Sequence, residues 1–265
     1  IMFLSKSDQQ LSNEYIKEGF IIKPVADNSA LEWIRSQFIR IISNELNIKS
    51  NSDYDEILNQ IHKLVPISEL NSFRLIIFQS LNSLSEFRKM YFKIAQPYLE
   101  SIVGNELAMQ LRVNLSIQFP DDESSLLPIH ADTWSGDSAY EVVVWIPLVD
   151  CYRTKSMYIL SPDKANNLNQ NFNDKSVTNS EELYESIIDD VKQLEVSYGE
   201  VLIFNQALPH GNRINKESET RWSMNCRFKG LFTPYKDKKI GEFFEPITMR
   251  AASRVSMNYK LPSVK

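Results

Sequence analysis

The spacing of apolar residues changes near residue 105, and this change restricts the possible fold more than any other feature. Before residue 105, apolar side chains recur at helical spacing, as at Leu31, Ile34 and Phe38. After it, the segment 112–119 alternates polar and apolar residues, which is the period of a strand with one buried face. Helices followed by a series of short strands predict an α+β protein, with the strands in a sandwich or jelly roll.

Further segments follow the same division. The expected helices begin at a capping box over 29–32 and cover 53–64, 68–81 and 85–103, with a possible short strand at 20–22. The expected strands after 112–119 cover 141–149, 156–160 and 221–228, with a hairpin over 195–204 that turns at 198–200.

We expect these elements to form a single domain over residues 1–265. Its predicted parts are a mainly helical support over 1–105, a jelly-roll core over 106–232 with an insertion at 163–193, and a C-terminal extension over 233–265. The inserted segment is polar and partly helical, and it interrupts the run of strands.

Composition and charge exclude several classes of protein. The net charge is −5 and no basic run occurs, which argues against a general nucleic-acid binder. The apolar runs are too short to span a bilayer, and the first residues lack the pattern of a signal peptide. Cys151 and Cys226 have no metal-type spacing and are interpreted as buried free thiols. We therefore expect a cytoplasmic protein that binds a small-molecule substrate and neither nucleic acid nor a membrane; the oligomeric state stays open.

Histidine is scarce in this chain, and two of the three histidines lie next to expected strands. His130 and Asp132 are two residues apart, so in extended backbone an imidazole and a carboxylate point to the same side. His210 follows the expected strand 201–204. Two histidines and one carboxylate on one face of an octahedron are the ligands of non-haem iron(II) oxygenases. We predict that these three residues bind the metal and are catalytic, whereas His62 has a solvated or capping role on a helix.

An arginine follows on the next expected strand. Arg221 and Ser223 share one strand face, and a guanidinium with a neighbouring hydroxyl suits a carboxylate. This is the chemistry needed to hold the distal carboxylate of 2-oxoglutarate while its keto acid end chelates iron. The alternative for Arg221 is an ion pair with a surface acid such as Glu217 or Glu219.

Other residues are candidates for the same pocket, each with a structural alternative. Asn114 and Tyr158 are candidates for co-substrate binding, and Trp134, Gln118 and Arg227 are candidates for substrate binding. Arg227 shares the face of the arginine described above and has a structural ion pair as its alternative. Asn114 and Gln118 equally fit a solvated sheet face, and Trp134 equally fits packing in a lid.

Several short segments resemble the superfamily of 2-oxoglutarate- and Fe(II)-dependent dioxygenases. They are His130-Ala131-Asp132-Thr133-Trp134, Trp145-Ile146-Pro147-Leu148-Val149-Asp150, Ser156-Met157-Tyr158-Ile159-Leu160, Leu208-Pro209-His210-Gly211-Asn212 and Arg221-Trp222-Ser223. The chain resembles the phytanoyl-CoA-hydroxylase-like branch, and within it most resembles a bacterial group named after a streptomycin-biosynthesis protein and found in carbohydrate gene clusters. Many relatives carry Pro-Gly-Ser-His after the middle strand, where this chain has Leu160-Ser161-Pro162-Asp163-Lys164.

The resemblance implies a double-stranded β-helix core of the cupin-like kind, with Fe(II), 2-oxoglutarate and O2 as cofactor and co-substrates. It implies a dioxygenase that oxidises a small polar metabolite, sugar or natural-product intermediate. Hydroxylation is the default reaction, and desaturation or cyclisation use the same oxidant. A halogenase is disfavoured because Asp132 is present.

Other functions remain open at this point. One alternative is an oxygenase of the same fold that uses an amino-acid-type co-substrate or none, against which Arg221 argues. Another is a cupin-like metal-dependent isomerase or binding protein without oxygen chemistry. A third is a non-catalytic interaction protein that has kept the fold.

Overall fold

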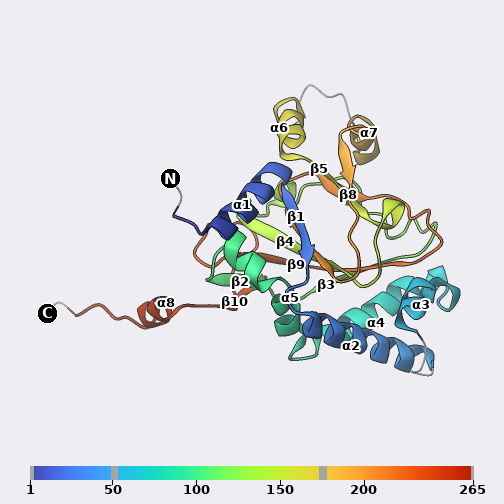
Figure 1. The fold of residues 1–265 in the computed structure, drawn as a ribbon, viewed down its shortest axis with the longest axis horizontal. Coiled ribbons are helices and arrows are strands. Elements are labelled where there is room, and N and C mark those ends of the chain that lie inside the picture. The colour runs from blue at the N-terminus through green and yellow to red at the C-terminus, as the bar shows by residue number, and fades with distance from the viewer. Residues whose placement is uncertain (1–2, 49–52, 173–177, 264–265) are drawn as a thin grey trace.

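The computed structural model describes residues 3–48, 53–172 and 178–263, which are arranged in layers (Figure 1). Helices cover one face of a large antiparallel sheet, and a smaller antiparallel sheet packs against its other face. No helix in these ranges is long and apolar enough to cross a membrane. The result is a mixed fold of helices and antiparallel sheet.

Strands from both ends of the chain enter the larger sheet. Its order is β1-β7-β4-β9-β2-β10, and β3 also pairs with β9. The strands of this sheet are β1 Phe20–Pro24, β2 Leu107–Gln110, β3 Asn114–Gln118, β4 Glu141–Pro147, β7 Glu200–Asn205, β9 Arg221–Gly230 and β10 Phe244–Pro246. The smaller sheet has the order β6-β5-β8, with β5 Met157–Leu160, β6 Val191–Gln193 and β8 His210–Asn212.

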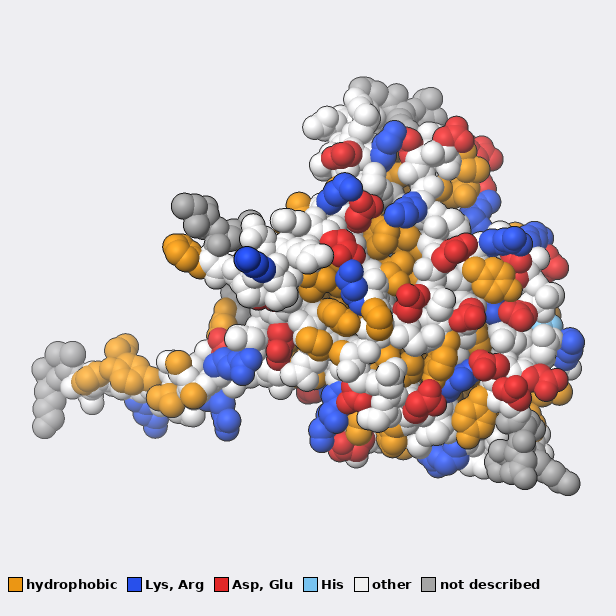
Figure 2. All heavy atoms as spheres, in the orientation of Figure 1, with side chains coloured by type: hydrophobic (Ala, Val, Ile, Leu, Met, Phe, Trp, Pro, Cys, Tyr) orange, Lys and Arg blue, Asp and Glu red, His pale blue; other side chains and the backbone are white. Residues whose placement is uncertain are grey.

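The helices fall into separate groups along the chain. Those that precede β2 are α1 Lys6–Glu18, α2 Asn28–Leu46, α3 Tyr54–Asn59, α4 Leu70–Asn82 and α5 Phe87–Ile102. The inserted segment contributes α6 Pro162–Gln170 and α7 Ser180–Glu185, which lie on the opposite side of the molecule from α2 and α4 (Figure 1). The last helix, α8 Ala251–Ser256, lies in a segment that projects from the body with hydrophobic and basic side chains on its surface (Figure 2).

Alternation along β4 explains the layers. Val142 and Val144 pack into the apolar core shared with the helices, whereas Val143 and Trp145 pack into the core shared with the smaller sheet. Because both faces of this strand are covered, its sequence is a nearly continuous apolar run. The hydroxyl of Tyr91 on α5 donates to the Val144 carbonyl at 2.9 Å, which ties the helical layer to the sheet.

Two expectations about helices are wrong. The cap of α2 is Asp27, whose carboxylate accepts from Ala30 N at 3.0 Å, and not Ser29. Ser29 already lies within the first helical turn, and its hydroxyl donates to Asp27 instead. The expected helix over 53–64 ends at Asn59 and is followed by a 3-10 turn over Ile61–Lys63.

The expected hairpin over 195–204 is also wrong. Val196 forms a bridge with Cys151, whereas β7 pairs with β1 and β4 inside the larger sheet. The segments before and after the turn therefore pair with different strands and not with each other. The physical reason is that the apolar residues of β7 are buried on both faces, so this strand is covered best between two others.

Candidate metal centre

A short backbone bridge places the two histidines of the predicted triad side by side. His130 N donates to the carbonyl of His210 at 3.0 Å, and His210 N donates to the carbonyl of His130 at 2.8 Å. Their ring centroids are 4.4 Å apart. Asp132 begins the next 3-10 turn, and its backbone N donates to the Gln206 carbonyl at 3.0 Å. Ligand atoms of the three side chains all lie within 4.8 Å of one another.

Gly211 permits the close approach of the chain next to His210. A Cβ atom at this position would lie 2.6 Å from the Tyr158 hydroxyl oxygen and 2.7 Å from the Leu127 carbonyl oxygen. Any side chain here would push these groups away and disturb the backbone beside the bridge. A glycine is therefore required by space rather than by its φ angle.

Both imidazoles are oriented by a backbone carbonyl two residues earlier. His130 Nδ1 lies 2.9 Å from the Pro128 carbonyl oxygen, and His210 Nδ1 lies 2.8 Å from the Leu208 carbonyl oxygen. A carbonyl oxygen only accepts, so Nδ1 carries the proton and Nε2 keeps its lone pair for a metal ion. The two rings therefore present the same nitrogen in the same way.

The protonation states match a metal-binding set of two imidazoles and one carboxylate. Burial lowers the pKa of His210 to about 4, so this ring is neutral at neutral pH. Burial acts to raise the pKa of Asp132, but its hydrogen bond with His130 and the charge of Arg227 outweigh it and lower the pKa well below its usual range. Burial acts to lower the pKa of His130, yet the contact with Asp132 outweighs it and raises the pKa. A bound cation would take the place of the proton that His130 carries when it is charged beside Asp132.

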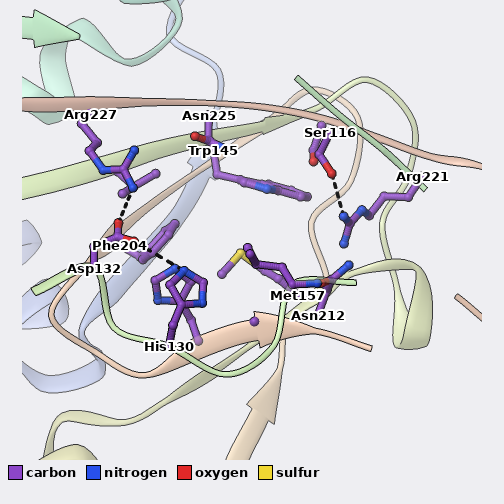
Figure 3. A pocket seen from close by; sticks show the side chains of 15 residues that line it. Ser116, His130, Asp132, Trp145, Met157, Phe204, Asn212, Arg221, Asn225 and Arg227 are labelled. Atoms are coloured by element: carbon purple, nitrogen blue, oxygen red, sulfur yellow. Dashed lines mark hydrogen bonds and ion pairs between the residues drawn. The ribbon is translucent and has the colours of Figure 1, made fainter. Parts of the chain in front are cut away.

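The triad lies at one end of a cavity, and Arg221 lies toward the other end (Figure 3). The cavity has a volume of about 110 Å³, which suits a small acid better than a large ligand. Trp145, Met157 and Phe204 border the space between the two ends (Figure 3). A charged group therefore stands at each end of a largely apolar middle.

Arg221 is a buried cation without a carboxylate partner in the described part of the chain. Its Nη2 donates to the Ser116 hydroxyl at 2.8 Å, while its Nε and the nearby Ser223 hydroxyl have no partner among the described residues. Burial lowers its pKa to about 10, so it stays charged at neutral pH. An uncompensated buried charge is costly, so the site favours an anion entering the cavity.

The surface acids considered for Arg221 bind other residues. Glu219 pairs with Lys155 at 2.7 Å, and Glu217 accepts from the Thr154 hydroxyl at 2.9 Å. The surface ion pair is therefore not formed. Both Arg221 and Ser223 line the cavity.

Four predicted pocket residues lie outside the cavity lining as the described residues define it. Asn114 donates to Asn225 Oδ1 at 2.9 Å, and Gln118 is fully buried and donates to the Arg213 carbonyl at 2.8 Å. Tyr158 is buried in the core between the sheets. Trp134 is 43% exposed and packs against Phe172, with ring centroids 5.6 Å apart. Asn114 and Gln118 therefore hydrogen-bond to protein neighbours, whereas the Tyr158 hydroxyl has no hydrogen-bond partner among the described residues.

Arg227 lines the cavity but forms an ion pair with the triad. Its Nη2 donates to Asp132 Oδ2 at 2.7 Å (Figure 3). Its Nε donates to Gln206 Oε1 at 3.0 Å. These bonds correspond to the structural alternative considered for this residue. They are made possible by β4 and β9 pairing with Val143 opposite Arg227, close to the loop that carries Asp132.

Sequence reasoning did not select several polar residues that line the cavity or support it, among them Ser116, Asn212 and Gln206. Ser116 lies on the polar face of the alternating segment 112–119, so the alternation could have identified it as a candidate. Asn212 follows His210 by two residues, and it donates to Gln118 Oε1 at 3.1 Å. Gln206 is fully buried in the connection after β7, where no periodicity marks it.

Comparisons with known proteins support the fold. No protein-family model matches this chain, and no curated protein matches it. Among solved structures, a nickel complex of the non-haem monooxygenase ThoJ is 13% identical, with 94% of this chain and 93% of that chain covered and a TM-score of 0.55.

Two further solved structures show the same likeness. The non-haem α-ketoglutarate-dependent carbocyclase SnoK from nogalamycin biosynthesis is 15% identical, with 93% and 97% of the two chains covered and a TM-score of 0.53. HygX from Streptomyces hygroscopicus, with nickel and 2-oxoglutarate bound, is 15% identical, with 88% and 89% covered and a TM-score of 0.51. Over nearly its whole length, the chain therefore has the mixed helix-and-sheet fold seen in these non-haem enzymes.

Proposed function

We propose that this protein is a non-haem Fe(II)- and 2-oxoglutarate-dependent oxygenase. The observation that carries the proposal is the pairing of two features in one cavity. One end holds two histidines and a carboxylate, and the other holds the buried Arg221, which has no carboxylate partner among the described residues. The named ligands of HygX, which shares the fold, are nickel and 2-oxoglutarate, and they match these two ends.

The proposal includes the architecture and the branch of the superfamily. Two antiparallel sheets with the triad between them support a double-stranded β-helix core. A single domain is supported because β1 and β10, from opposite ends of the chain, both pair within the larger sheet. The phytanoyl-CoA-hydroxylase-like branch rests on the sequence segments around His130, His210 and Arg221. Free, buried Cys151 and Cys226 agree with the cytoplasmic location that we propose.

The residues present fit the proposed cofactor and co-substrate. His130, Asp132 and His210 would hold Fe(II), and Arg221 with Ser223 would bind the distal carboxylate of 2-oxoglutarate. When bound, these groups supply the oxidation of substrate by O2 coupled to decarboxylation of 2-oxoglutarate to succinate. Apolar side chains such as Trp145 and Met157 line the space between the two ends and would limit the contact of bound groups with water. The unpartnered Arg221 Nε and Ser223 hydroxyl are the donors that a carboxylate would satisfy.

We further propose that the oxidised substrate approaches from the side of His130. The His130 side chain is 28% exposed, against 7% for Asp132, so this edge of the triad faces solvent. Trp134 lies on this loop and is exposed. The proposed substrate is a small polar metabolite, sugar or natural-product intermediate. Hydroxylation is the proposed default, with desaturation and cyclisation as the other reactions of the same oxidant; SnoK, which shares the fold, is named a carbocyclase.

The test is anaerobic addition of Fe(II) and then 2-oxoglutarate to the purified protein. We expect a weak visible charge-transfer band that needs both additions and is lost in Arg221→Met, which keeps a flexible, unbranched side chain but removes the guanidinium charge. Bound iron without the band would contradict keto acid chelation and favour a metal-dependent protein without oxygen chemistry. Failure to bind iron would contradict the metal centre itself.

A further inference from the structure

The two oxygens of Asp132 face different neighbours. Oδ1 lies 3.4 Å from His130 Nε2, on the side where the imidazoles converge. Oδ2 accepts a hydrogen bond from Arg227 Nη2 at 2.7 Å (Figure 3). A bond of this length between a guanidinium and a carboxylate is charge-assisted and roughly twice as strong as a neutral one. Oδ1 therefore faces the other residues of the triad, whereas Oδ2 is held by Arg227.

Arg227 is itself held in place by buried groups. Its Nε donates to Gln206 Oε1 at 3.0 Å and lies 3.5 Å from Asp137 Oδ2. Gln206 in turn donates to Glu141 Oε2 at 2.9 Å, and its backbone carbonyl accepts from Asp132 N at 3.0 Å. The side chain and the backbone of Asp132 are thus fixed by the same small network.

This network reaches the segment that follows β9. Lys238 forms an ion pair with Asp137, and Asp237 N donates to the Gly136 carbonyl at 3.5 Å. The Lys238 side chain is 27% exposed, so the network runs from the triad to the surface. Positive and negative groups alternate along it, which lets each buried charge meet a partner.

We propose that Arg227 is a positioning residue that holds Asp132 Oδ2 and so restricts Asp132 to a single metal-donor oxygen. This inference rests on the proposed function. A carboxylate that binds through both oxygens would occupy a position which a keto acid needs, because three positions must stay open beside the triad. To bind in that way, Asp132 would have to give up a buried, charge-assisted bond. Arg227 therefore keeps a coordination position free for the co-substrate.

The two arginines of β9 thus have different roles despite facing the same cavity. Arg221 has only the Ser116 hydroxyl as a hydrogen-bond partner among the described residues, which leaves its charge available to an anion. Arg227 already has a carboxylate and an amide oxygen on two of its nitrogens. Its charge is therefore largely neutralised by the protein, which argues against its acting as a substrate anchor.

The first test compares Arg227→Met with the matched variant Arg221→Met, using Co(II) as a spectroscopic probe for the metal. Without 2-oxoglutarate, the Co(II) absorption spectrum should change in Arg227→Met and stay as in the wild type in Arg221→Met. With 2-oxoglutarate, Arg227→Met should bind the co-substrate about 10- to 100-fold more weakly, the loss typical of removing a residue that supports a metal ligand, and this loss should exceed the loss of Co(II) affinity. Arg227→Lys, which keeps a cationic donor, should restore part of the wild-type spectrum.

Other outcomes would overturn the proposal. An Arg227→Met spectrum identical to the wild type, with unchanged 2-oxoglutarate binding, would do so, as would complete loss of Co(II). A crystal structure of the wild-type protein with Co(II) gives a second test that needs no variant. Asp132 bound through Oδ1 alone is the expected result, and binding through both oxygens would overturn this inference alone. A wild-type protein that binds no metal would overturn the proposed function as well.

Discussion

The two faces of β9 differ in what they require of their side chains. One face packs into the apolar core beneath the helices and carries Trp222, Met224, Cys226 and Phe228. The other face borders the cavity and carries Arg221, Ser223, Asn225 and Arg227. The helix-facing side needs shape and apolar volume, whereas the cavity-facing side needs particular nitrogen and oxygen atoms at particular places.

This difference teaches that one strand serves stability and ligand binding almost independently. Neighbouring residues point to opposite sides, so Trp222 contacts Phe38 and Phe73, while Arg221 next to it contacts Ser116. Changes on the helix-facing side should alter the free energy of unfolding and leave ligand affinity intact. Changes at Arg221 and Ser223 on the cavity-facing side should do the reverse.

The largest effect is expected at the triad. Asp132→Ala should reduce turnover by more than about 100-fold, since even residues that only support metal ligands contribute 10- to 100-fold. Iron affinity should fall with it, while circular dichroism should still show a folded protein. Succinate release and iron titration measure the two effects. Unchanged turnover would remove Asp132 from the metal centre.

The largest effect on the helix-facing side is expected at Trp222, which is fully buried and donates from Nε1 to the Leu58 carbonyl at 2.8 Å. Trp222→Ala should lower the free energy of unfolding by about 3–5 kcal/mol, as for other large-to-small core changes. Urea denaturation measures this loss. The folded fraction should bind 2-oxoglutarate as the wild type does, and a selective loss of binding would break the contrast between the faces.

Arg221→Met should weaken 2-oxoglutarate binding by about 10- to 100-fold, because hydrogen bonds to a charged group contribute about 1.5–3 kcal/mol. Iron affinity should stay unchanged. The thermal stability of the ligand-free protein should stay the same or rise, because a buried charge without a carboxylate partner is removed. Parallel titrations and melting curves provide the check, and an equal loss of both affinities would contradict the assigned role.

Ser223→Ala should have a smaller effect on the same ligand. A single neutral hydroxyl contributes about 0.5–1.5 kcal/mol, so 2-oxoglutarate should bind roughly 2- to 10-fold more weakly. Stability without ligand should not change, because the hydroxyl has no partner in the described structure. Isothermal titration resolves a change of this size, and a loss of stability would show a structural role instead.

The smallest effect on turnover is expected at His62, the histidine outside the triad. Its Nδ1 lies 2.9 Å from the Thr220 hydroxyl, on the helical side of the molecule. His62→Ala should cost about 1 kcal/mol of stability, the value of one ordinary hydrogen bond, and leave turnover unchanged. Loss of turnover here would show that the helical layer contributes to the site directly.

Much of the fold could be predicted from the sequence because periodicity is a local property. The alternating segment 112–119 contains β3, and the alternating segment 221–228 lies within β9. The apolar run 141–149 contains β4. Errors arose where a choice between partners was needed. The segment 195–204 was expected to pair with itself, but β7 pairs with β1 and β4.

The candidate site divides in the same way. By itself, the sequence determined which residues share a strand face and which ligand types are available, including His130 and Asp132 on one side of the chain. Long-range contacts make His210 bridge to His130 and Arg227 bind Asp132, and they leave Arg221 without a carboxylate partner in the described ranges. Arg221 and Arg227 have identical chemistry and share one strand face. Their different roles come from neighbours contributed by distant segments, which local periodicity does not encode.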